Sequence, residues 1–340
     1  MTHTIDVQTP HGLVKFHYCI DISTPTDKDA SAVDLNLPTG CSYTRSTFLA
    51  VYLNPNSQIL VSVASTSSLS TFSCTDRPRR KPAVYGEKDA ADDVAAFMDA
   101  IALPPCVVFG VSMGTIIGLR LALSHSDKVT GLFLVSPLGG AEPEVSGNGR
   151  RQIFDTWREA FTGDKVDQEA LDDTAFGGLQ LCWNSRKFPL ADALYPITFV
   201  ECIAHWQPET FPAFETTIVT FFTDRKGYTH EELATLRDKP VILSICSEDI
   251  VYPPEYFAKF AKQLEDAGVD IIVQNLEGAP HFGSATHHNI VNPLLAKFVP
   301  KQWKGSEVPP PPDSLVVSPF EPFLREAGWE PEGDDSDDEY

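Results

Sequence analysis

Apolar and polar positions follow two periods along this chain, one typical of strands and the other typical of helices. The strand-like stretches are Thr4–Val7, Leu13–Ile20, Phe48–Leu53, Val107–Phe109, Leu132–Val135, Val241–Cys246 and Asp270–Leu276. The helical patterns cover Lys88–Leu103, Arg151–Phe161, Pro254–Ala267 and His287–Phe298. Strands that alternate with helices in this way indicate an α/β protein.

The alternation is interrupted once and then resumes. Residues 139–238 contain helical patterns, the scattered tryptophans Trp157, Trp183 and Trp206, and a phenylalanine-rich stretch, Phe211–Phe222. We interpret this block as a helical cap inserted into a core made of residues 1–138 and 239–304. Residues 305–340 hold a run of four prolines and an acidic end, a composition that cannot bury enough apolar surface to order itself and therefore predicts a disordered tail.

The net charge of the chain limits the kinds of molecule that it can bind. The formal net charge is −21, so the chain repels phosphate backbones and anionic membrane surfaces, and we expect no nucleic-acid partner. Part of this charge is local, because residues 330–339 carry seven carboxylates and no basic residue. Recruitment of a basic protein partner by this tail is a weaker hypothesis. A basic run at Arg77–Lys81 is interpreted as a solvated loop.

The seven cysteines are spread widely and form no C-x-x-C pair, which argues against a disulfide framework or a zinc ribbon. The N-terminus has no basic segment followed by an apolar one, and no apolar stretch is long enough to span a bilayer. These features predict a cytoplasmic location. No metal-ligand spacing and no phosphate-binding glycine loop occurs, so we expect no cofactor and no metal.

The most informative motif is Gly110-Val111-Ser112-Met113-Gly114, a G-x-S-x-G sequence that follows an apolar run and precedes a helix-like stretch. A nucleophile elbow needs this context, namely a buried strand, a sharp turn that carries serine, and a helix that begins at the serine. Glycines flank the serine because the turn leaves no room for a Cβ there. The structural alternative is a tight packing turn with an ordinary serine.

A serine nucleophile requires a base and an orienting acid, and the elbow predicts them later in the chain, in the order acid then histidine. Asp249 follows the strand Val241–Cys246, and His281 follows the strand that ends at Leu276. Glu248 is the rival acid, and capping of a helix is the alternative role of Asp249.

Four other histidines compete with His281 for the role of base. His287 and His288 lie inside the terminal helical pattern and are expected at the surface. His125 and His205 do not follow strands and are more simply structural.

With these motifs the chain resembles the α/β-hydrolase superfamily, and within it the capped fungal α/β hydrolases with a serine nucleophile. The resemblance rests on residues 85–103, 109–114, 129–137, 248–253 and 279–283 and covers about 85–300. It implies a mostly parallel central sheet flanked by helices, with Ser112 as nucleophile, Asp249 as acid and His281 as base. It also implies that the Met113 N–H is one donor of the oxyanion hole.

One segment departs from the family pattern. After its third strand the family places a His-Gly or His-Pro pair, and the next residues supply the second oxyanion donor. After the strand Phe48–Leu53 this chain has Asn54-Pro55-Asn56 instead. Proline has no N–H, so Asn54 is the expected donor, or else Asn56. We interpret residues 54–84 as strongly diverged or as altered by an error in the gene model, such as a shifted reading frame.

The sequence as a whole predicts a serine hydrolase that cleaves an ester or a similar small acyl substrate through an acyl-enzyme. Two alternatives remain: an acyltransferase with the same triad, and, because of residues 54–84, a non-catalytic ligand-binding hydrolase fold.

Overall fold

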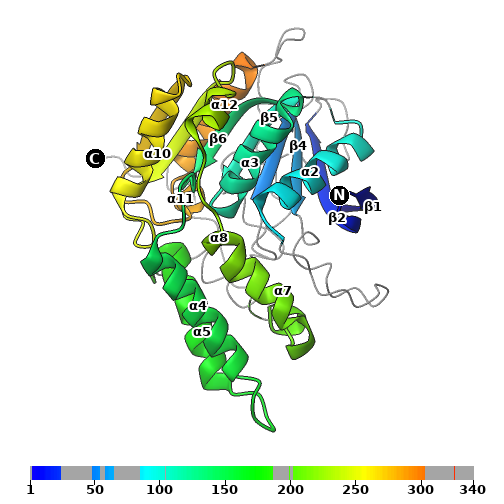
Figure 1. The fold of residues 1–340 in the computed structure, drawn as a ribbon, viewed down its shortest axis with the longest axis vertical. Coiled ribbons are helices and arrows are strands. Elements are labelled where there is room, and N and C mark those ends of the chain that lie inside the picture. The colour runs from blue at the N-terminus through cyan, green and yellow to red at the C-terminus, as the bar shows by residue number, and fades with distance from the viewer. Residues whose placement is uncertain are drawn as a thin grey trace, which may run out of the picture.

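The computed structural model describes residues 2–23, 48–53, 58–64, 85–103, 105–186, 199, 202–302 and 325 of the chain. Its centre is an eight-stranded sheet in the order β1-β2-β4-β3-β5-β6-β7-β8. The strands are β1 (Thr2–Thr9), β2 (Gly12–Ser23), β3 (Phe48–Leu53), β4 (Gln58–Ala64), β5 (Cys106–Val111), β6 (Val129–Val135), β7 (Val241–Cys246) and β8 (Ile271–Leu276). Figure 1 shows this sheet running through the body of the molecule, with helices on both sides.

The second half of the sheet is parallel. β5 pairs with β6, β6 with β7 and β7 with β8, all in the same direction. Helical or longer segments connect these strands, as parallel neighbours require. The carboxyl ends of β5, β7 and β8 therefore meet at one edge of the sheet, where the loops that carry Ser112, Asp249 and His281 begin.

The first half of the sheet is antiparallel, so the predicted mostly parallel arrangement holds for β5–β8 only. β3 is antiparallel to both β4 and β5, and Phe48, its first residue, lies opposite Val111. The reason is chain length: only residues 54–57 separate β3 from β4, and a parallel crossover needs about a dozen residues or more. β4 lies within the stretch 54–84 that departs from the family pattern, and the rest of that stretch is outside the described residues.

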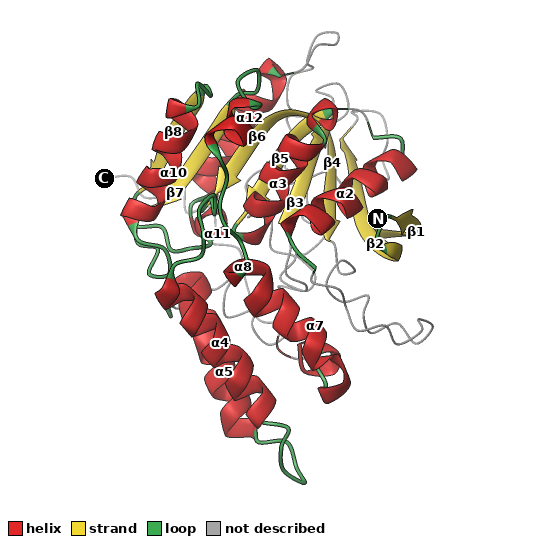
Figure 2. Cartoon of the chain, viewed as in Figure 1, coloured by secondary structure: helices red, strands yellow, loops and turns green. Residues whose placement is uncertain are grey.

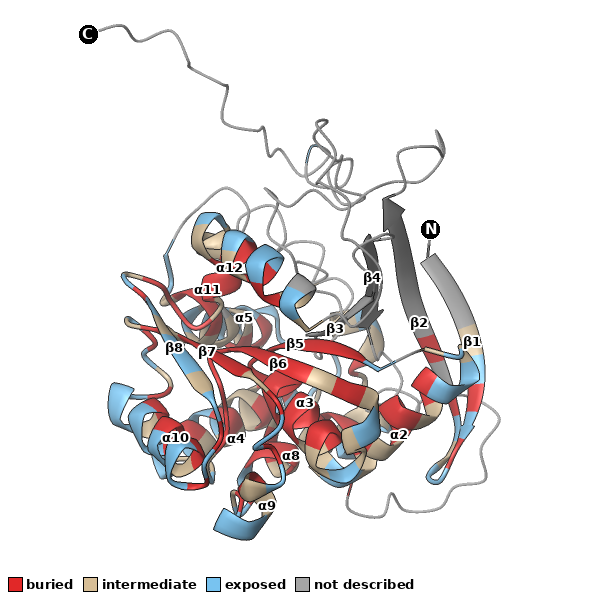
Figure 3. Ribbon diagram, turned by 90° about the horizontal axis from the view of Figure 1, so that it is seen from above, coloured by how far each residue is buried: buried red, intermediate tan, exposed pale blue. Residues whose placement is uncertain are grey.

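Each face of the sheet carries its own hydrophobic cluster because successive side chains of a strand point to opposite faces. On one face, Val108 and Leu243 pack with α2 (Glu87–Ala100), α3 (Met113–Ser124) and α10 (Pro254–Asp266). On the other, Phe109 and Phe133 pack with α12 (His288–Lys301). Figure 3 shows α12 on one side of the sheet and α2, α3 and α10 on the other. The short helices η2 (Ser126–Lys128), α9 (His230–Ala234) and α11 (Gly283–Thr286) complete the layers.

The segment between β6 and β7 forms a helical lobe that extends away from the sheet (Figure 2). It contains α4 (Glu144–Glu159), α5 (Gln168–Trp183), η3 (Pro208–Thr210), α7 (Phe211–Glu215), η4 (Thr216–Thr220) and α8 (Phe221–Thr223). α4, α5 and α7 share a separate aromatic cluster that includes Trp157, Trp206 and Phe214. Phe221 and Phe222 already belong to the main cluster, so the separate packing ends before α8, earlier than the expected boundary at 238.

The predicted elements outside residues 24–84 agree with the structure to within a few residues, except that α4 begins at Glu144, seven residues before the predicted start at Arg151. The predicted helix Lys88–Leu103 ends earlier, at Ala100, because the chain turns through Ala102, whose φ is 53°, and Pro104 follows soon after. The predicted helix His287–Phe298 is preceded by α11, and His287 lies at the junction between α11 and α12. The predicted tail, 305–340, lies outside the described residues except for Arg325.

Candidate active site

Ser112 occupies a strained turn between β5 and α3. Its φ is 51°, a left-handed value that side chains rarely adopt, and its backbone N–H donates to the Val135 carbonyl at 3.1 Å. Because the helix begins directly after it, the serine lies at the positive end of the α3 dipole. Strain of this kind persists where the surrounding structure holds it, which is common at functional turns.

Gly110 has no room for a side chain. A Cβ at this position would lie 2.6 Å from the Gly114 carbonyl oxygen and 2.9 Å from the Thr115 nitrogen, and both are backbone atoms. The strand and the helix can therefore meet at this distance only because residue 110 is glycine.

Gly110→Ala is expected to lower the free energy of unfolding by about 1–3 kcal/mol, because neither backbone atom can rotate out of the way. Urea unfolding measures the change. The matched control is Gly149→Ala in α4, where the added Cβ meets nothing within 4 Å, and a helix interior gains about 0.5–1 kcal/mol from the same change. Equal stabilities for the two variants would contradict the close contact at Gly110.

Ser112, His281 and Asp249 form a continuous hydrogen-bonded line. Ser112 Oγ lies 2.8 Å from His281 Nε2, and His281 Nδ1 lies 2.6 Å from Asp249 Oδ2. His281 is fully buried, and Ser112 is 8% exposed. An ionised carboxylate at Nδ1 keeps the ring proton on that nitrogen, which leaves Nε2 free to accept the serine proton.

The two adjacent acids that the sequence left open have different surroundings. The Asp249 carboxylate is buried, and its Oδ1 accepts N–H bonds from Val251 at 2.9 Å and Tyr252 at 3.0 Å, so its orientation is fixed. The Glu248 side chain is 48% exposed and pairs with Arg186 instead. Only Asp249 reaches His281.

The loop that carries His281 is anchored from two sides. The Ser136 hydroxyl donates to the His281 carbonyl at 2.6 Å. The Tyr252 ring is stacked on the imidazole, with centroids 5.4 Å apart and planes inclined by 27°. Because Tyr252 also donates its N–H to Asp249, one residue contacts both the acid and the base.

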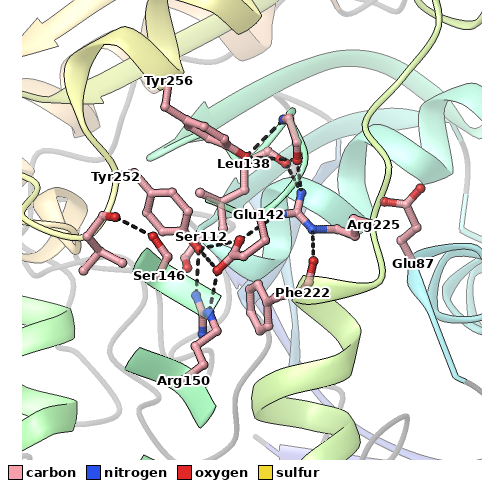
Figure 4. Close-up of polar contacts among 12 residues, drawn as sticks. Glu87, Ser112, Leu138, Glu142, Ser146, Arg150, Phe222, Arg225, Tyr252 and Tyr256 are labelled. Atoms are coloured by element: carbon pink, nitrogen blue, oxygen red, sulfur yellow. Dashed lines mark hydrogen bonds and ion pairs between the residues drawn. The ribbon is translucent and has the colours of Figure 1, made fainter. Parts of the chain in front are cut away.

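Tyr252 connects the site to a buried ionic cluster formed by Glu142, Arg150 and Arg225 (Figure 4). Its hydroxyl lies 2.9 Å from Glu142 Oε1 and accepts from Arg150 at 2.8 Å. Glu142 also pairs with Arg150 at 2.8 Å and with Arg225 at 2.9 Å. Burial, opposed by Arg150, raises the pKa of the Tyr252 phenol above its usual value, so the phenol remains neutral.

The other predicted residues do not join this line. His125 pairs with Asp92 at 2.8 Å, His205 lies against the Trp206 ring, and His287 and His288 are half-buried near the start of α12. Met113 is the first residue of α3, the position from which an elbow offers a backbone donor.

Asn54 lies outside the described residues. Its role as an oxyanion donor therefore stays a prediction.

The sequence reasoning missed Tyr252, Glu142, Arg150 and Arg225. Tyr252 lies three residues after Asp249, so its position in the acid loop was a usable signal. No local signal marks the other three as buried partners.

Within the described part of the chain, no group of three or more His, Cys, Asp or Glu side chains is placed to hold a metal ion. Burial raises the pKa of the nearby Cys246 thiol to about 12, which keeps it protonated and makes it a poor rival nucleophile. No described helix combines the length and apolar character that a membrane crossing requires.

Comparisons with known proteins agree with the fold. A family model described as the alpha/beta hydrolase fold matches residues 68–177. Over 78 residues the chain is 35% identical to a Caulobacter vibrioides protein named "Putative carbamate hydrolase RutD". That match covers 23% of this chain and 27% of the relative, so the chain spans about a quarter of the relative's length.

Three solved structures resemble most of the chain. An esterase from Thermogutta terrifontis has a TM-score of 0.54 and 14% identity, and the match covers 88% of this chain and 99% of that one. Carboxylesterase CesB from Bacillus subtilis has a TM-score of 0.55 and 14% identity, covering 88% and 91%. Homoserine O-acetyltransferase from Bacillus anthracis has a TM-score of 0.58 and 11% identity, covering 91% and 98%. These matches and the sheet order confirm the α/β-hydrolase fold.

Proposed function

We propose that this protein is a serine hydrolase that cleaves an ester or a similar small acyl substrate through an acyl-enzyme intermediate. The observation that carries the proposal is the buried line from Ser112 Oγ to His281 Nε2 at 2.8 Å and from His281 Nδ1 to Asp249 Oδ2 at 2.6 Å. A structural turn would not require a buried imidazole and a buried carboxylate aligned on its serine. Carbamates belong to the same acyl class, and the match to RutD makes them part of the substrate range to be tested.

In the first half of the reaction, Ser112 Oγ attacks the substrate carbonyl carbon and its proton passes to His281 Nε2. The imidazolium that forms donates through Nδ1 to Asp249, whose negative charge stabilises it. The negative charge on the former carbonyl oxygen is stabilised by the Met113 N–H at the start of α3. Collapse of the tetrahedral intermediate transfers the proton from His281 to the leaving group and leaves the acyl group on Ser112.

In the second half, a water molecule takes the place of the leaving group. His281 accepts its proton while the water oxygen attacks the acyl carbon, and the same proton returns to Ser112 Oγ as the acid product leaves. In the alternative acyltransferase, an alcohol or thiol takes the position of water and the same residues act. The difference between the two depends on how water is excluded.

We further propose that the lobe between β6 and β7 is the cap of a capped hydrolase of the fungal serine group, placed over a core made of residues 1–138 and 239–304. Its separate aromatic cluster supports a distinct packing unit. We also propose a cytoplasmic location, which the buried thiols of Cys106 and Cys246 suit.

A fluorophosphonate probe tests the proposed nucleophile. Such probes phosphonylate a serine that a neighbouring base has activated, so we expect one adduct on the native protein, mapped by peptide mass spectrometry to Ser112. Urea-unfolded protein is the control and should not react, since unfolding separates Ser112 from His281. A folded protein that gains no adduct, or gains one elsewhere, would refute the serine mechanism and favour a ligand-binding fold.

A further inference from the structure

The C-terminal end of α5 contacts both loops that carry triad residues. The Cys182 carbonyl accepts the Phe282 N–H at 3.0 Å, directly after His281. The Asn184 side-chain amide donates to the Glu248 carbonyl, directly before Asp249. One turn of the chain, more than sixty residues before either loop, thus holds the neighbours of both the base and the acid.

Arg186 connects the two loops to each other. Its guanidinium is ion-paired with the Glu248 carboxylate and also donates to the Gly278 carbonyl at 2.8 Å. Gly278 lies in the loop that leads to His281, where its φ is 75°. A guanidinium can serve both partners at once because its donors form a rigid planar fork.

The backbone that presents these side chains is strained. Asn184 and Ser185 both have a φ of 55°, and neither is glycine. Two consecutive left-handed residues are unfavourable and persist only where other contacts hold them. The turn makes backbone bonds of its own, from the Asn184 N–H to the Gln180 carbonyl and from the Arg186 N–H to the Trp183 carbonyl, and its side chains add contacts to the acid and histidine loops.

The ion pair itself contributes little to stability. The side chains of Arg186 and Glu248 are 46% and 48% exposed, so water screens their attraction. α5 packs mainly on α4, through residues such as Leu171 in the lobe's own cluster, and not on the sheet. Because the turn continues α5 and bonds to both loops, a displacement of the lobe would displace the two loops as well.

We propose that Asn184 and Arg186 are positioning residues that keep Asp249 and His281 at hydrogen-bonding distance. The position of the α4–α5 lobe relative to the two loops then determines the activity of the triad. This inference rests on the proposed serine mechanism. Neither residue contacts the reacting atoms; both act through the loops that carry them. When the lobe is displaced, the Asp249–His281 contact loses its geometry and Ser112 loses its activated base.

Arg186→Ala tests the proposal through kinetics measured beside stability. Small displacements of catalytic groups have large effects on rate, so we expect about a tenfold fall in kcat and in the rate of fluorophosphonate inactivation. KM and the thermal midpoint should stay near the wild-type values, since substrate contacts and core packing are untouched. Arg186→Lys should restore part of the rate, because the ammonium keeps the charge but not the two-loop fork.

The matched control is Arg158→Ala, which removes another half-exposed arginine of the same lobe, paired only with Asp155. It should leave kcat within twofold of wild type. Glu248→Gln removes the ion pair without altering α5, and it should lower kcat severalfold even if Arg186→Ala does not fold.

Two results would overturn the inference: a kcat of Arg186→Ala within twofold of wild type, or a fall that matches its loss of folded protein. If the wild-type protein itself does not react with the probe, the serine mechanism is refuted, and this result is distinct from failure of the positioning role.

Discussion

Replacing Ser112 with alanine is expected to lower kcat for ester hydrolysis by about a millionfold, the size of effect seen when the nucleophile of a serine triad is removed. Without Oγ there is no atom to form the acyl-enzyme, and His281 has no proton to accept in the first step. The residual rate of the variant would come from activation of water by His281 and from stabilisation of the oxyanion. The measurement is steady-state hydrolysis of a panel of p-nitrophenyl esters with graded acyl chains, together with one aryl carbamate.

The variant should remain folded. The Ser112 hydroxyl makes its hydrogen bond to His281, and loss of one such bond costs about 1 kcal/mol in the free energy of unfolding. The control is Ser124→Ala, the same substitution at the exposed far end of α3, which should keep wild-type rates. A folded Ser112→Ala protein that retains more than about a hundredth of the rate would exclude Ser112 as nucleophile.

The three predicted site residues that the structure brings together share a local signal in the sequence. Ser112, Asp249 and His281 each follow a strand that its apolar residues reveal, and parallel strands bring their carboxyl ends together. The order of the three residues along the chain then assigns the nucleophile, the acid and the base each to its own loop. For the same reason β5 to β8 and α10 could be placed from sequence within a few residues.

What the sequence did not reveal depends on distant pairing. The antiparallel pairing of β3 with β4 follows from the short connection between them. β4 was not recognised because from Ser62 onward the sequence is rich in serine and threonine. No local pattern marks Glu142, Arg150 and Arg225 as buried, since their ion pairs form only in the folded chain. The contact of the α5 end with the acid and histidine loops is likewise a long-range event without a local pattern.

Glu142→Ala is expected to lower the free energy of unfolding by about 3–5 kcal/mol, because removal of one member of a buried ion cluster leaves its partners uncompensated. The side chains of Glu142 and Arg150 are 2% and 4% exposed, so water cannot replace the lost carboxylate. Arg225 keeps bonds to the Leu138 and Gly140 carbonyls, whereas Arg150 keeps only the Tyr252 hydroxyl and the Phe222 ring. Arg150 should therefore account for most of the loss.

That assignment can be measured by equilibrium urea unfolding of a double-mutant cycle. Adding Arg150→Met to Glu142→Ala should recover part of the stability, because it removes the unpaired charge and keeps an apolar chain against Phe222. The control is Glu144→Ala, two residues further along and exposed at the start of α4, where only a few tenths of a kcal/mol should change. Equal losses at Glu142 and Glu144 would show that the cluster is hydrated. The alternative outcome is a large loss in the free energy of unfolding at Glu142 alone that Arg150→Met partly reverses. It would show that buried charge pairing holds the segment around Glu142 against Tyr252, whose ring is stacked on His281.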